Sequence, residues 1–146
     1  SKFHCYRPDI LIVTNIEFDH GDIFSSIADI ENEFRGLFEK MPVNGHIIAC
    51  FDAEGARKVV SEFKAKHPEG PKITWYGENK ACDVRILNKS LAEEDSTIGF
   101  QQKLTLSVKV KELEISTALT GAHNALNIAA AISVLDILKL DLISLK

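Results

Sequence analysis

The stretch Ile10-Leu11-Ile12-Val13-Thr14 decides the fold of this chain. Its four apolar residues are unbroken, and such a run is typical of a strand that is buried on both faces of a parallel sheet. A polar segment, residues 15–22, follows the strand directly. Because open α/β sheets bind ligands where their parallel strands end, we expect any binding site to involve this segment.

Helices and strands alternate after this first strand. Apolar residues recur at steps of three and four over residues 22–41, which predicts a helix with Asp22 as its N-cap. A strand over residues 46–51, a helix marked by residues 56–63 and a strand around residues 72–76 complete a βαβαβ pattern. This pattern favours a parallel sheet with right-handed crossovers.

The pattern changes in the second half of the chain. From residue 82 to residue 119 apolar and polar residues alternate, which predicts three or four short antiparallel strands. An alanine-rich helix is expected over residues 123–138. We therefore expect a single domain that consists of a βαβαβ part, an antiparallel part and a helical part, at residues 1–80, 81–120 and 121–146.

Composition narrows the function classes. The chain has 146 residues and a net charge of −4, so it can bury a core but lacks the basic excess of a nucleic-acid binder. Its three cysteines, an odd number without a CxxC pair, favour free thiols in a reducing cytosol. No apolar run is long enough to span a bilayer.

The segment after the first strand contains Glu17, Asp19, His20 and Asp22. Carboxylates and one imidazole in such a turn suit Mg²⁺, which prefers oxygen ligands and bridges to phosphates. The alternative is that Asp19 and Asp22 cap the following helix while His20 packs on the turn. Glu31 and Glu33 are expected on the solvated face of that helix.

A second polar group lies where the last helix begins. Asn124 and Asn127 are three residues apart, so they share one helix face and could contact the edge of a nucleobase. The alternative is that this group only caps the helix. Trp75 and Tyr76 are interpreted as sheet packing rather than as a stacking platform. These residues contain no GxxxxGK[ST] phosphate loop.

Together the two motifs resemble the central ATP-binding domain of the Mur ligases, which join amino acids or peptides to UDP-N-acetylmuramate in bacterial cell-wall synthesis. Residues 13–20 resemble the family's TN-x-x-x-DH motif, and residues 121–131 resemble its G-x-HN-x-x-N-x-x-AA motif. The flanking residues 3–8 and 17–24 resemble one branch, which attaches the tripeptide L-alanyl-γ-D-glutamyl-meso-diaminopimelate in murein recycling. The alternatives are the branch that attaches L-alanine and a non-catalytic binding module.

The resemblance implies a mostly parallel α/β sheet flanked by helices, P-loop or Rossmann-like but without its phosphate loop, and a small antiparallel β subdomain. It also implies a cytoplasmic bacterial enzyme that uses ATP and Mg²⁺ and forms an acyl phosphate. His20 would bind the second Mg²⁺ and Asp19 would orient it, which makes both catalytic candidates; His123, Asn124 and Asn127 would contact the adenine. Residues 21–39 lack the carbamylated lysine of several members.

The resemblance further implies an N-terminal domain for the UDP-sugar, a phosphate loop and a C-terminal domain, all outside these residues. A phosphate-loop lysine supplies much of the charge neutralisation in such sites. We therefore expect residues 1–146 alone to show no ligase activity. The expected partners are UDP-N-acetylmuramate and an amino acid or peptide, without nucleic acid or membrane.

Overall fold

The computed structural model describes residues 2–18, 24–93 and 100–141. Two compact units share these residues, Ser1–Ile73 and Thr74–Lys146, and the chain passes from one to the other within a single strand, β3 (Lys72–Gly77). The elements of the first unit that precede β3 are a 3₁₀ helix η1 (Lys2–Cys5), β1 (Ile10–Val13), α1 (Ile27–Phe38), β2 (His46–Cys50) and α2 (Glu54–Lys66).

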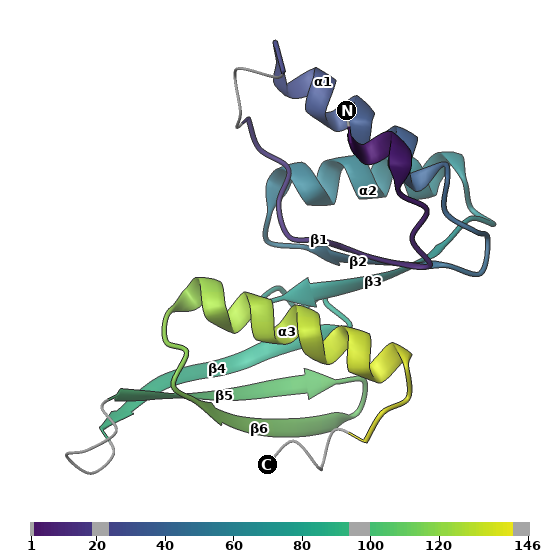
Figure 1. The fold of residues 1–146 in the computed structure, drawn as a ribbon. Helices are drawn as coiled ribbons and strands as arrows, with labels where there is room; N and C mark the ends of the chain where they lie inside the picture. The colour runs from purple at the N-terminus through teal and green to yellow at the C-terminus, as the bar shows by residue number, and fades with distance from the viewer. Residues whose placement is uncertain (1, 19–23, 94–99, 142–146) are drawn as a thin grey trace. The chain divides into compact units, whose positions relative to one another are not determined.

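The first unit is a parallel βαβα arrangement. Strand β1 pairs in parallel with β2, with Ile10 opposite His46 and Val13 opposite Ala49. Helices α1 and α2 lie on the same side of these two strands (Figure 1). Right-handed crossovers that progress in one direction along a sheet place successive helices on one face, so this arrangement is the expected one.

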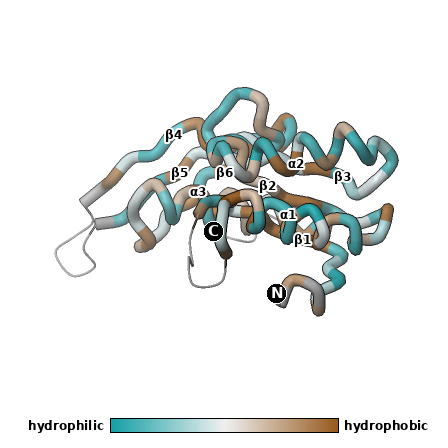
Figure 2. Tube along the Cα trace, turned by 90° about the horizontal axis from the view of Figure 1, so that it is seen from above, coloured by the Kyte–Doolittle hydropathy of each residue, from teal (hydrophilic) through white to brown (hydrophobic). Residues whose placement is uncertain are grey.

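Aromatic rings join helices α1 and α2 in the core of this unit. Phe38 is fully buried, and its ring centroid lies 6.2 Å from that of Phe34 and 5.3 Å from that of Phe63. Ile47 and Ile48 of β2 are also fully buried. Hydrophilic and hydrophobic residues alternate along α1 and α2 (Figure 2), as expected for helices that bury one face.

Two expectations about this unit are wrong. Strand β1 is not buried on both faces, because Ile12 is 42% exposed. Both helices of this unit lie on one face of the strands, and no described part of the unit covers the opposite face. Helix α1 does not begin at Asp22, which lies outside the described residues, but at Ile27. Its N-cap is Ser26, whose hydroxyl accepts a hydrogen bond from the Asp29 backbone N–H.

The second unit is an antiparallel sheet covered by one helix. Its elements after β3 are β4 (Val84–Glu93), β5 (Phe100–Val108), β6 (Lys111–Thr117) and α3 (Ala122–Ile137). Strand β4 pairs in parallel with β3 at Tyr76 and Gly77, and antiparallel with β5, which in turn pairs antiparallel with β6. Figure 1 shows α3 lying along these strands.

Small side chains bring α3 close to its sheet. Ala125 and Ala129 of α3 are fully buried, and Leu104 and Leu106 of β5 are at most 1% exposed. The alanines of this helix therefore form part of the core of the second unit. Tyr76 is 1% exposed, which agrees with sheet packing. The predicted α/β fold, with parallel strands, flanking helices and a small antiparallel part, is confirmed.

Candidate functional site

The first motif begins at the carboxyl end of β1. Thr14 and Asn15 are exposed, and the Asn15 side-chain oxygen accepts a hydrogen bond of 2.9 Å from the Ile16 N–H. Ile16 is 4% exposed, whereas Glu17 and Phe18 face solvent. Asp19 and His20, the predicted catalytic pair, lie outside the described residues, so their roles stay predictions.

The carboxyl end of β2 lies at the same edge, because β1 and β2 run in parallel and Val13 pairs with Ala49. Phe51 and Asp52 follow β2 there. Arg57 of α2 donates a hydrogen bond of 2.6 Å to the Phe51 carbonyl, and its guanidinium carbon lies 5.2 Å from the Phe51 ring centroid. The Arg57 guanidinium thus binds the loop after β2 through two contacts with Phe51, which the sequence did not predict.

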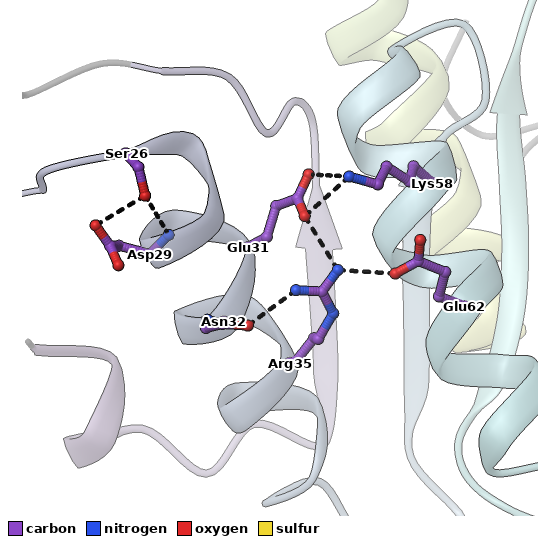
Figure 3. Close-up of polar contacts among 7 residues, drawn as sticks. All are labelled: Ser26, Asp29, Glu31, Asn32, Arg35, Lys58 and Glu62. Atoms are coloured by element: carbon purple, nitrogen blue, oxygen red, sulfur yellow. Dashed lines mark hydrogen bonds and ion pairs between the residues drawn. The ribbon is translucent and has the colours of Figure 1, made fainter.

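Helices α1 and α2 are joined by a network of charged side chains (Figure 3). Lys58 Nζ lies 2.7 Å from one oxygen of Glu31, and Arg35 donates to the other oxygen at 3.0 Å and to Glu62 at 2.7 Å. Glu31 is only 7% exposed. The expectation of a solvated Glu31 is therefore wrong.

The network also shifts the pKa values of Glu31 and Arg35. The hydrogen bond from Lys58 lowers the pKa of Glu31, against a smaller opposing effect of burial, and Arg35 lowers it further. The hydrogen bond to Glu62 raises the pKa of Arg35. A signal for this burial existed in the sequence: Glu31 lies four residues after Ile27 and three before Phe34, on the apolar stripe of the helix.

The second motif forms the start of α3. Gly121 precedes the helix with φ of +98°, a conformation that L side chains rarely adopt. His123 and Asn127 are exposed, and Asn124 is half-buried. The Asn124 amide nitrogen donates a hydrogen bond of 2.8 Å to the Thr120 carbonyl. The three predicted nucleotide contacts thus share the first two turns of one helix, and their binding role stays a prediction.

A metal site is not completed by the residues that the structure describes. Among them no three histidine, cysteine or acidic side chains are grouped as metal ligands. The donors available at the end of β1 are the side chains of Asn15 and Glu17, with Asp19 and His20 following in sequence. Oxygen atoms with a single imidazole fit Mg²⁺, which prefers oxygen and keeps several waters.

No helix in the described part of the chain is long and apolar enough to cross a membrane. Among the described cysteines, Cys5 is exposed, Cys50 is buried and Cys82 is half-buried, and none of the three is in a disulfide.

Comparison with known proteins gives a family for nearly the whole chain. Residues 2–135 match the family model described as "Mur ligase middle domain". The chain is 34% identical over 134 residues to the UDP-N-acetylmuramate–L-alanine ligase of Buchnera aphidicola, covering 91% of this chain and 25% of that protein. It is 33% identical over 129 residues to the ligase of the same name from Rhodopseudomonas palustris, covering 86% of this chain and 26% of that protein.

Solved structures share the fold at lower sequence identity. MurF ligase from Thermotoga maritima, in complex with ADP, matches 95% of this chain and 30% of its own with a TM-score of 0.71 and 15% identity. An FPGS–AMPPCP complex matches 92% of this chain and 31% of its own with a TM-score of 0.69 and 17% identity. The chain spans about a quarter of the length of the curated relatives it matches.

Proposed function

The chain belongs to the Mur ligase middle domain family, and from this premise we propose that it is part of an ATP-dependent ligase that joins an amino compound to UDP-N-acetylmuramate. The observation that carries the proposal is the presence of both motifs in one family match, the first after β1 and the second at the start of α3. The curated relatives named above are ligases that act on UDP-N-acetylmuramate.

The proposed reaction has two balanced steps. A carboxylate oxygen of the sugar's lactyl group attacks the γ-phosphorus of ATP, and the bond to the β-phosphate oxygen breaks to give an acyl phosphate and ADP. The amine then attacks the acyl carbon, loses a proton, and expels inorganic phosphate as the amide forms. Catalysis of this kind consists mainly of positioning and of neutralising phosphoryl charge.

Residues of this chain would supply the metal and nucleotide contacts. His20 would hold Mg²⁺ with Asp19 orienting its ring, and the bound ion would neutralise charge on phosphoryl oxygens. His123, Asn124 and Asn127 would contact the adenine. The Asn124 amide nitrogen donates one of its two N–H groups to the Thr120 carbonyl, and its amide oxygen would accept a hydrogen bond from the adenine amino group.

We further propose that the amine substrate is the tripeptide L-alanyl-γ-D-glutamyl-meso-diaminopimelate. Support for this finer assignment comes from residues 3–8 and 17–24, whose sequence resembles the tripeptide branch. L-alanine is the second candidate, because the relatives named above are L-alanine ligases.

The test uses the full-length protein encoded by the source gene. It is incubated with UDP-N-acetylmuramate, ATP and Mg²⁺ and with either the tripeptide or L-alanine, and ADP release and product mass are measured. We expect kcat/KM to favour the tripeptide by at least about tenfold. A preference for L-alanine would overturn the tripeptide assignment alone, whereas no ATP-dependent product with either amine would overturn the ligase proposal.

A further inference from the structure

Arg57 of α2 is fixed at the edge of the first unit where the parallel strands β1 and β2 end. Its Nη1 donates a hydrogen bond of 2.6 Å to the carbonyl oxygen of Phe51, the residue that follows β2. Its guanidinium carbon also lies over the Phe51 ring, 5.2 Å from the ring centroid. A guanidinium that contacts a ring through its face keeps its N–H edges able to donate to other acceptors.

The first turn of α2 also lies against the first motif. A Cβ atom placed on Gly55 would lie 1.9 Å from the carbonyl oxygen of Ile16, which is closer than real Cβ atoms come to backbone. Gly55 therefore provides the space in which α2 contacts the chain that leaves β1. Arg57, two residues further along α2, is thus at the edge where open α/β sheets bind their ligands.

Most N–H groups of Arg57 have no acceptor in the described part of the chain. A guanidinium carries several such groups, and among the described residues the Phe51 carbonyl is the one acceptor that Arg57 meets. Arg35 of the same unit differs, because its donors are used on side chains of both helices, those of Asn32, Glu31 and Glu62. Arg57 is half-buried, so an anion paired with it would be partly shielded from water.

We propose that Arg57 binds an oxyanion, a carboxylate or phosphate group of a substrate, at the carboxyl edge of β1 and β2. This inference rests on the proposed function, in which ATP, UDP-N-acetylmuramate and the amine substrate all carry such groups. The planar fork of a guanidinium matches two oxygens of a carboxylate or phosphate, and its charge strengthens the hydrogen bonds. The contacts with Phe51 hold this fork in place before the anion binds, which reduces the entropy lost on binding.

The experiment measures the affinity of the full-length protein for each substrate separately by calorimetry in the presence of Mg²⁺. The ligands are a non-hydrolysable ATP analogue, UDP-N-acetylmuramate and, added last, the tripeptide or L-alanine. Arg57→Met keeps the apolar stem and removes the charge, whereas Arg57→Lys keeps the charge and removes the fork. The matched control is Lys66→Met, which removes one positive charge from the exposed last turn of the same helix.

We expect Arg57→Met to weaken the binding of one ligand at least about tenfold, the effect of losing charge-assisted hydrogen bonds, and that of the others by less than about twofold. The ligand affected identifies the source of the anion. Arg57→Lys should keep the wild-type melting temperature, because its ammonium can still donate to the Phe51 carbonyl, yet it should recover only part of the affinity. Lys66→Met should leave every affinity unchanged.

Two results overturn the inference. The first is a folded Arg57→Met protein whose affinities all lie within about twofold of the wild type; if this variant does not fold, wild-type affinities in Arg57→Lys have the same meaning. The second is an equal loss of every affinity with a lower melting temperature in both Arg57 variants, which would show that Arg57 only holds the loop after β2.

Failure of the proposed function gives a different result. If the wild type binds these ligands but forms no amide, the ligase proposal fails while the comparison of the Arg57 variants still decides the inference. If the wild type binds none of the ligands, the inference fails together with the proposed function.

Discussion

Replacing Glu31 with glutamine tests the charged network between α1 and α2. The variant keeps the shape of the side chain but removes the charge that faces Lys58 at 2.7 Å and Arg35 at 3.0 Å. Hydrogen bonds to ionised groups are roughly twice as strong as neutral ones. Losing this advantage at two partners would cost about 2 kcal/mol.

Solvent reduces this cost. The Lys58 side chain is 52% exposed and can regain water, and Arg35 keeps its contact of 2.7 Å with Glu62. We therefore expect Glu31→Gln to lower the free energy of unfolding by about 1–2 kcal/mol at pH 7. With a urea m-value of about 2 kcal/mol/M, the unfolding midpoint should fall by about 0.5–1 M.

The pH dependence has a definite sign. The pKa of Glu31 is lowered in the folded state, mainly by Lys58, so its ionised form stabilises the fold above the ordinary value of 4.5. This contribution is lost as pH falls from 4.5 through the lowered folded-state pKa. The difference in the free energy of unfolding between wild type and Glu31→Gln should therefore have its full size at pH 7 and be smaller at pH 3.

Urea unfolding followed by circular dichroism at both pH values checks the prediction. The matched control is Glu69→Gln, at an exposed turn residue, which should change stability by less than about 0.5 kcal/mol. A midpoint for Glu31→Gln that matches the control at pH 7, or a difference that stays constant down to pH 3, would refute the reasoning.

Three further predictions concern single side chains. Ser26→Ala removes the N-cap of α1 and should lower stability by about 1 kcal/mol in urea unfolding, whereas Ser26→Asp should restore most of it. Burial, with a smaller effect of Lys72, lowers the pKa of His46. The contribution of His46 to stability should therefore be full above pH 6.5 and decline as pH falls through the folded-state pKa. A His46→Gln variant whose stability depends on pH as that of the wild type does would contradict this. In the full-length protein, Asn127→Ala should weaken ATP-analogue binding about 3- to 10-fold by calorimetry, with unchanged thermal stability because the side chain is exposed.

The sequence by itself determined which elements form and where the two motifs stand. Periods of 3.6 and 2 residues are local properties, so α2, α3 and the antiparallel strands follow from the pattern to within a few residues. The two motifs also indicated the family, because each is a continuous stretch of sequence: one follows the first strand and the other begins the last helix. Asp19 and His20 remain known from sequence alone.

Only the tertiary structure decided which faces are covered and which atoms meet. Glu31 shares the apolar stripe of α1, but its burial with Lys58 depends on α2 packing 27 residues away along the chain. Ile12 is exposed although its strand is apolar, because both helices of its unit lie on one side. Gly55 has no sequence signal: the need for glycine arises from the Ile16 carbonyl, which approaches only after β1 and α2 have packed.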